Sequence, residues 1–128
     1  MSAASDYLEN ALLDHTLRNT AYTSPTTVYL GLSTGSFGDD NSGTELSGNG
    51  YARQAITCSA ASSGSITNSS QISFPTATGS WGTVSHVGVF DASSSGNLLF
   101  HGALSSSKAI ESGDVLKIDA SSLTFTLA

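Results

Sequence analysis

The sequence predicts a mainly β protein, an antiparallel β-sandwich with one N-terminal α-helix. Residues of opposite polarity alternate with a period of two over 26–32, 51–59, 81–90 and 115–127, as in strands with one buried face. Clusters of Ser, Gly, Asn and Asp, which favour turns, separate these segments. Helical spacing is confined to residues 6–18. We therefore expect about eight short strands behind a single helix.

The chain of 128 residues is long enough for one domain with one core. We expect this domain to span residues 1–128, with the helix at about 6–18 and the sandwich at about 26–127. Charged residues make up 11% of the chain, against about 25% in ordinary soluble domains. The polar surface must therefore come from Ser, Thr, Asn and Gly, and much of it could be covered by other protein copies.

The N-terminal helix is predicted to begin at Asp6, with Asp6 as its cap and Glu9 as the capping-box partner. One side carries most of the apolar residues: Tyr7, Leu8, Ala11, Leu12 and His15. Leu13 and Leu17 form a second apolar strip on another side. Two interpretations stay open: the strip contacts a second neighbour such as another subunit, or the helix is sunk in its own domain.

The segment 33–50 is predicted to be a long loop, with five glycines and many polar residues. We expect it to be too polar to pack, hence mobile alone and ordered only against a partner. The strand after it, 51–59, places Cys58 on an inward face, where the cysteine would be a small buried residue.

The segment 81–90 is the clearest strand, and residues 92–97 break it before residues 98–100 resume as the return strand of a hairpin. Trp81, Thr83, Ser85, Val87 and Val89 are assigned to one face, and Gly82, Val84, His86, Gly88 and Phe90 to the other. The remaining strands are expected at 65–68, 71–74, 108–110, 115–120 and 123–127, with a turn at 111–114.

The expected core consists of inward-facing residues of these strands. Leu116 is assigned to the face opposite Ile118. The predicted members are Val28, Leu30, Leu32, Ile56, Ile72, Phe74, Val87, Val89, Leu99, Val115, Ile118 and Phe125.

The net charge of −6 and the scattered bases argue against several partners. Arg18, Arg53, Lys108 and Lys117 form no basic stripe, so nucleic-acid binding is not expected. An acidic surface also argues against binding to anionic membranes. The N-terminus lacks the pattern of a signal peptide and no window could span a bilayer, so we expect the protein in the cytoplasm of its producing cell, or released by lysis.

No catalytic, cofactor-binding or metal-binding residue is predicted, and the protein is not expected to be an enzyme. His15, His86 and His101 fall in different elements, without the spacing of metal ligands. The segment 39–43 resembles only the start of a calcium loop. The serines lack the G-x-S-x-G pattern of a nucleophile elbow.

Arg53 directly follows the acidic loop, and two roles are open for it. It could hold Asp39, Asp40 or Glu45 and so fix the loop, or it could reach a neighbouring subunit. Arginine and tyrosine often anchor interfaces. We therefore predict interface roles for Tyr51 and Arg53, in addition to Leu13 and Leu17.

Several segments, taken in order, resemble a family of small tailed-bacteriophage and prophage virion proteins, often labelled tail-fibre-like, with relatives understood to be capsid cement proteins. These segments are NALLDH (10–15), YTSPTTVYLGL (22–32), TELSG (44–48), YAR (51–53), FP (74–75), WGTVSH (81–86), GNLL (96–99) and GD (113–114). The resemblance covers nearly the whole chain. It implies a β-structured structural protein of the virion without catalytic residues.

Within this resemblance, a capsid cement or decoration protein is favoured, because the chain has no coiled-coil heptads and no shaft repeat. Its partner would be the major capsid protein of the same phage, on the outer capsid surface, after assembly in the host cytoplasm. We expect a homotrimer. The alternatives are a tail, baseplate or tail-fibre component, and a carbohydrate-binding or hydrolytic module with an exposed aromatic residue or an acid pair in a cleft.

Overall fold

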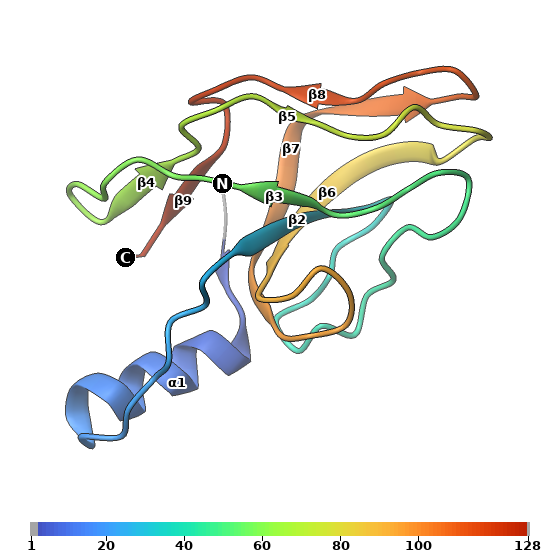
Figure 1. The fold of residues 1–128 in the computed structure, drawn as a ribbon. Coiled ribbons are helices and arrows are strands. Elements are labelled where there is room, and N and C mark those ends of the chain that lie inside the picture. Colours follow the sequence, from blue (N-terminus) through green and yellow to red (C-terminus); the bar gives the residue numbers. More distant parts are fainter. Residues whose placement is uncertain (1–2, 128) are drawn as a thin grey trace.

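The computed structural model describes residues 3–127, and all strand pairings in this range are antiparallel (Figure 1). The prediction of a mainly β fold with one helix is confirmed. In chain order the elements are β1 (Ala3–Ala4), α1 (Asp6–Leu17), β2 (Val28–Ser33), β3 (Gln54–Ile56), β4 (Ser65–Thr67), β5 (Ile72–Ser73), β6 (Gly82–Phe90), β7 (Leu98–Ile110), β8 (Lys117–Ile118) and β9 (Thr124–Thr126).

The largest sheet has five strands in the order β1-β7-β6-β2-β3. The predicted hairpin is confirmed: Phe90 of β6 pairs with Leu98 of β7, and the Asp91 amide donates to the Asn97 carbonyl at 3.2 Å. The two strands predicted at 98–100 and 108–110 belong to the single long strand β7.

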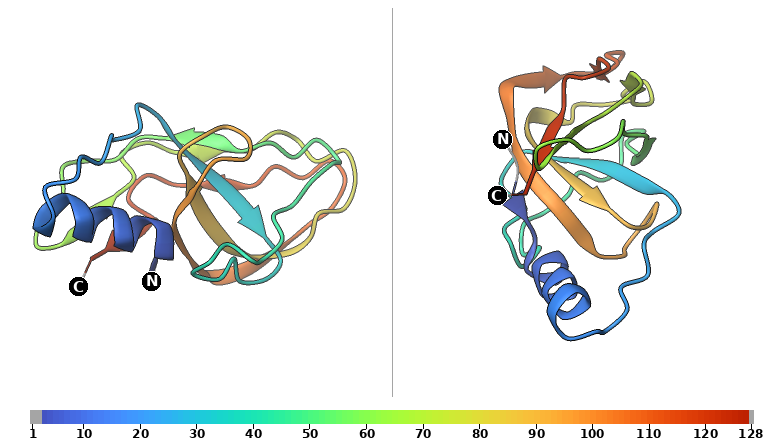
Figure 2. Two further views of the ribbon diagram at one scale, coloured as in Figure 1. Left: turned by 90° about the horizontal axis from the view of Figure 1, so that it is seen from below. Right: turned by 90° about the vertical axis from the view of Figure 1, so that its left-hand side faces the viewer.

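Two small ribbons, β4–β9 and β5–β8, form a second layer over one face of the large sheet (Figure 2). Their inward residues join those of β2, β6 and β7 in one core, as a sandwich requires. The core comprises Ala4, Leu8, Leu30, Leu32, Ile56, Ile72, Phe74, Ala77, Trp81, Val84, Val87, Val89, Leu99, Ile110, Leu116, Ile118, Leu123 and Phe125.

The predicted faces of residues 81–90 are wrong in part, because β6 and β7 shift register. Val84 pairs with Lys108 but His86 pairs with Ala103, so residues 104–107 stand opposite Ser85 alone. This bulge interrupts the regular alternation of inward and outward side chains along β6, so residues on its two sides no longer follow one period of two. Val84 is therefore buried in the same core as Val87.

Three burial predictions are also wrong. Val115 is 41% exposed, whereas Leu116 is buried, and Leu116 lies on the same side as Ile118 because residues two apart on a strand share a face. Strand β3 is shorter than the predicted strand and ends before Cys58. Cys58 is exposed as a result, and partial burial still raises the pKa of its thiol.

Helix α1 begins at Asp6, as predicted, but its N-cap lies one residue earlier than expected. Ser5, not Asp6, is the N-cap: its hydroxyl accepts from the Leu8 amide at 3.2 Å and donates to the Leu98 carbonyl. The helix extends away from the sheets in Figures 1 and 2, and Leu8 is its buried residue. The interpretation that the helix is sunk in its own domain is therefore wrong.

The long loop packs on the large sheet, contrary to the prediction that it is too polar to do so. Phe37 is 1% exposed and joins Phe90 and Leu98 in a small second core. Because Val89 and Phe90 are consecutive in β6, this core lies on the face away from the main one. A hydrogen bond of 2.9 Å from the Leu46 amide to the Leu32 carbonyl also holds the loop. Contacts within the domain are therefore enough to pack it, whereas the prediction required a partner.

Candidate assembly interface

Arg53 and Glu45 form a bidentate ion pair at the end of the long loop. Arg53 Nη2 donates to Glu45 Oε1 at 2.7 Å, and Arg53 Nε donates to Glu45 Oε2 at 2.8 Å. Arg53 Nη1 also donates to the Ala92 and Ser95 carbonyls, both at 2.8 Å. We call this set the Arg53 clasp; it joins the loop to the β6–β7 turn.

The clasp is largely shielded from water. The side chain of Arg53 is 7% exposed and that of Glu45 is 22% exposed. The guanidinium lies over the Phe90 ring at 3.6 Å from its centroid, where a cation–π contact adds to the ion pair. Shielded, bidentate geometry distinguishes this pair from exposed pairs such as Arg18–Asp14, whose side chains are 71% and 41% exposed.

Tyr51 connects the clasp to the main core. Its hydroxyl donates to Glu45 and accepts from the Leu32 amide at 2.9 Å, next to the point where β2 loses its partner β3. Its ring contacts Phe74 and, edge to face at 5.6 Å, Trp81. Burial, followed by the bond to Glu45, raises the pKa of Tyr51 well above its ordinary value.

Of the two roles left open for Arg53, pairing with Glu45 is the one that the structure contains. Tyr51 and Arg53 lie together and border a shallow hollow of about 400 Å³, with Ser47 and Ser94 on its rim. A role of this hollow in contacts with another protein stays a prediction.

Leu13 and Leu17 lie on a different part of the molecule, one turn apart on α1. Leu13 is 56% exposed and Leu17 is 78% exposed, whereas Leu8 is buried and Leu12 is half-buried against the core. The two leucines therefore face away from the domain. They form the outer apolar strip that the helical spacing predicted, and no described residue covers them.

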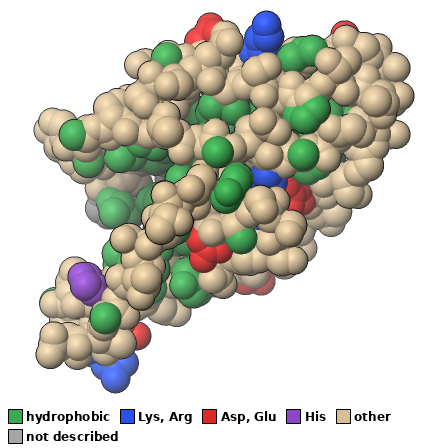
Figure 3. Space-filling view, viewed as in Figure 1, with side chains coloured by type: hydrophobic (Ala, Val, Ile, Leu, Met, Phe, Trp, Pro, Cys, Tyr) green, Lys and Arg blue, Asp and Glu red, His purple; other side chains and the backbone are tan. Residues whose placement is uncertain are grey.

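A large part of the surface carries no formal charge. No Asp, Glu, Lys or Arg occurs from residue 54 to residue 90, a segment that includes β3, β4, β5 and β6, nor from residue 120 to residue 127 around β9. The low overall charge indicated a surface of this kind. The composition did not show where this uncharged surface lies. It includes the β4–β9 ribbon because the two uncharged segments pair there. In Figure 3 the lobe formed by this ribbon shows hydrophobic and uncharged atoms.

The three histidines lie in different elements, and each has its own hydrogen-bond partner. His15 accepts from the Tyr22 amide, His86 bonds Ser85, and His101 meets Asp39 at 2.7 Å. Within residues 3–127, no three His, Cys, Asp or Glu side chains gather in a way that could hold a metal ion.

The segment 39–43 is a turn. The Ser42 amide donates to Asp40 Oδ1 at 3.1 Å, and hydrogen bonds from Ser42 lower the pKa of this carboxyl group. No helix in the described part of the chain has the length and apolar character needed to cross a bilayer.

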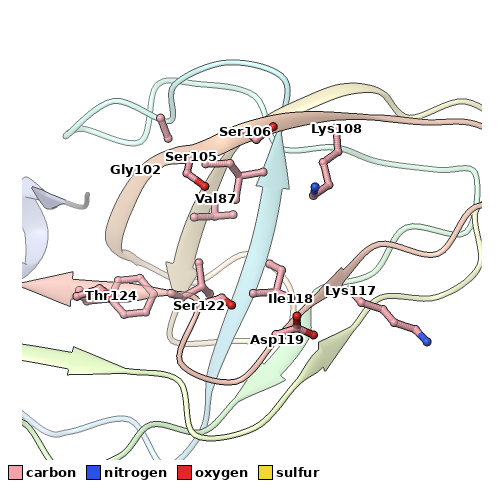
Figure 4. Close-up of a pocket in the computed structure, with 14 residues that line it drawn as sticks. Val87, Gly102, Ser105, Ser106, Lys108, Lys117, Ile118, Asp119, Ser122 and Thr124 are labelled. Carbon is pink, nitrogen blue, oxygen red and sulfur yellow. The ribbon is translucent and has the colours of Figure 1, made fainter.

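A groove of about 380 Å³ lies between β7 and the segment from β8 to β9 (Figure 4). Lys108 points into it, and Ser105, Ser106 and Ser122 supply hydroxyl groups. Phe125 contributes to its lining but is 5% exposed, so its ring face is not open for stacking on a sugar. Among the lining residues Asp119 is the one carboxylate, whereas a carbohydrate hydrolase ordinarily uses two.

Fold and surface together describe a small β-structured module with an outward apolar strip and a large uncharged surface, which are the properties of a structural assembly protein. The sequence model of the family described as podophage GP4 fiber I protein gp80 matches residues 3–126. The chain belongs to this family of phage fibre proteins, and it is a structural virion protein of a tailed bacteriophage. No curated protein sequence matches the chain.

Proposed function

We propose that this protein is a non-catalytic component of a phage tail fibre, which assembles with copies of itself and with neighbouring virion proteins. The observation that carries this proposal is the exposure of Leu13 and Leu17 on the outer side of a projecting helix. A 12-residue helix is marginally stable by itself in water, and covering its outer side would stabilise it.

The uncharged surface supports assembly as well. Copies with a net charge of −6 repel one another, and the repulsion is smallest where the facing surfaces carry no charge. Residues 54–90 and 120–127 provide such a surface. The family's description as a fibre protein favours the tail as the location.

A second candidate function is capsid cement, with the major capsid protein as partner. It is favoured by the shape of the domain: the described residues contain one 12-residue helix and strands of at most 13 residues, without an extended shaft. A cement protein acts by adding contact area between capsid subunits, and interfaces of about 1,200–2,000 Å² per contact would suffice over many copies.

The two functions differ in where the protein sits and how many copies are present. Heads and tails can be separated from disrupted virions and the protein quantified in each fraction by mass spectrometry against the major capsid protein. A fibre component would be found in the tail fraction. Its copy number per virion would be a small multiple of the number of symmetry-related positions on the tail. Hundreds of copies in the head fraction would overturn the fibre proposal and support cement.

Homotrimer formation is part of both proposals, because closed symmetric oligomers are the usual outcome for repeated copies of one chain. Tyr51 and Arg53 are proposed to support a contact surface by fixing the loop beneath it. The exposed rim of that hollow, rather than the buried clasp, would meet the partner.

A further inference from the structure

We propose that the groove beside β7 receives a short extended segment of another virion protein, which adds as a strand to the open edge of β7 and places a carboxylate at Lys108. We call this groove of about 380 Å³, between β7 and the segment from β8 to β9, the edge groove (Figure 4). The proposed assembly with neighbouring virion proteins is the basis on which this contact rests.

Strand β7 has an edge without a strand partner in its second half. It pairs with β6 on one side, whereas on the other side β1 pairs with residues 100–101 alone. In the described part of the chain, no strand pairs with this second side from residue 104 to residue 109. Residues 104–107 have no register partner on β6 either, because they form the bulge opposite Ser85. Unpaired backbone groups of an extended strand are a template for a further strand.

The edge groove runs along this open edge. Side chains on one face of a strand come from every second residue, whereas the consecutive residues 102–106 of β7 line the groove. The opposite wall is also formed by consecutive residues, 117–119 and 122–125. Buried apolar side chains, among them Val87 and Ile118, form its base. A chain in this groove would therefore lie beside the backbone of β7, with small apolar side chains toward the base.

The four bases of the chain are of two kinds. Arg18 and Arg53 each form an ion pair with an acid of the same chain. Lys108 and Lys117 both line the edge groove, and no ion pair among the described residues includes either of them. Figure 4 shows the Lys108 side chain pointing into the groove and that of Lys117 pointing away from it. The Lys108 ammonium is therefore available to an acidic partner.

The carboxylate that already lines the groove has a partner of its own. Asp119 Oδ1 accepts a hydrogen bond from Gln71 Nε2 at 3.1 Å. An acidic side chain on an incoming segment would thus give Lys108 a counter-ion that its own chain does not supply. Complementary charge of this kind fixes the register of a bound strand and selects its sequence.

Charge also favours a different protein, not a second copy of this chain, as the source of the segment. None of the ten acidic residues lies in a strand: three are on α1, and the other seven are in loops and turns. Of these seven, all except Glu111 have side chains hydrogen-bonded within the chain. A second copy therefore offers no free extended segment with a carboxylate.

A lysine at a sheet edge has another established role, which is to prevent unwanted strand pairing. In that role a charge of either sign at position 108 would serve, because both oppose burial of the edge. Pairing with an acidic segment instead requires a positive charge. The sign of the charge at residue 108 thus separates the two roles.

The first test compares two charge reversals, Lys108→Glu and Lys117→Glu, in phage that produce only the variant protein. Both lysines are exposed strand residues beside the same groove, so Lys117→Glu is the matched control. We expect Lys108→Glu to lower the copy number per virion about tenfold or more, because like charges across an interface repel. Lys117→Glu should incorporate normally. Circular dichroism verifies folding, and equal incorporation of the two folded variants would overturn the inference.

The second test identifies the segment. Ser106, at the groove, is replaced by the photoreactive amino acid p-benzoylphenylalanine, with exposed Ser112 as the control position. Mass spectrometry of irradiated virions should find Ser106 cross-linked to one segment of a different virion protein that contains Asp or Glu, and Ser112 not cross-linked to it. Replacing that acid by Lys should restore the incorporation of Lys108→Glu.

Hydrogen exchange measures the backbone pairing itself. Amides of residues 104–109 should exchange rapidly in the isolated protein and be protected in the virion. A cross-link from Ser106 to a second copy of this chain would overturn the inference. So would a small anion at Lys108, which would leave these amides unprotected and no peptide cross-linked. Head and tail fractionation is a separate measurement, so failure of this contact and failure of the fibre proposal can be told apart.

Discussion

Gly31 of β2 and Gly88 of β6 are paired directly opposite each other, on the face of the sheet that the long loop covers. A Cβ at Gly31 would lie 2.8 Å from Glu45 Oε2 and 3.0 Å from Phe90 Cε1. A Cβ at Gly88 would lie 2.9 Å from Leu98 Cδ1 and 3.0 Å from Phe37 Cε2. The missing side chains thus leave the space in which the loop and its clasp pack.

Substituting either glycine should therefore weaken the domain. We expect Gly31→Ala and Gly88→Ala each to lower the free energy of unfolding by about 1–3 kcal/mol through overpacking. Gly35→Ala is the control, because no atom lies within 4 Å of its added Cβ and its φ is outside the left-handed region. Urea denaturation measures all three; equal stability of the three variants would contradict the close packing.

The Arg53 clasp should contribute far more to stability than the exposed pair on the helix. Arg53→Gln leaves Glu45 shielded without its cation, and we expect a loss of about 3 kcal/mol, the lower end for a buried pair. Arg18→Gln removes the exposed pair with Asp14 and should cost about 0–1 kcal/mol. The two variants share the same chemical change, so similar losses would refute the assigned role of the clasp.

Stability should decrease in alkaline solution because of Tyr51. Its folded-state pKa is raised, so the stabilisation is complete below the unfolded value of about 10 and is lost as pH rises above it. In that range the unfolded state releases the tyrosine proton and the folded state retains it.

The matched variant for this prediction is Tyr51→Phe. It should be about 1–3 kcal/mol less stable at neutral pH, since the Leu32 amide and Glu45 lose a partner. Its stability should also decrease less steeply above pH about 10. Parallel pH profiles for the two proteins, measured by urea denaturation, would exclude Tyr51 as the cause.

The second layer of the sandwich should depend on two phenylalanines. Phe74 is 2% exposed and Phe125 is 5% exposed, so truncation of either to Ala should cost about 3–5 kcal/mol. Val115→Ala, at a site 41% exposed, should cost less than about 0.5 kcal/mol. A loss below 1 kcal/mol at both phenylalanines, by the same denaturation, would mean that the layers are assigned wrongly.

An interface role of the hollow above the clasp can be tested without disturbing the clasp. Ser47→Lys and Ser94→Lys add bulk to its exposed rim, and together they should prevent incorporation into virions with little change in stability. Ser112→Lys, exposed in the turn before β8, serves as the control. Quantitative mass spectrometry of purified particles gives the copy number; normal incorporation of the double variant would end the idea.

Alternation, turn residues and helical spacing were enough to predict the class of fold, because they are local properties of the chain. Residues 28–33, the hairpin of β6 and β7 and the helix were predicted close to where they occur. Helical spacing also singled out Leu13 and Leu17 as a strip apart from the rest, since their common face depends only on the geometry of one helix.

Contacts between segments far apart in the sequence could be assigned only from the three-dimensional structure. Three acids were possible partners for Arg53; Asp39 binds His101 and Asp40 binds Ser42, which leaves Glu45. The polar loop packs because two glycines far apart in sequence open a space for Phe37 and the clasp. Such contacts depend on strand register and on the bulge opposite Ser85, and a local pattern does not encode either of them.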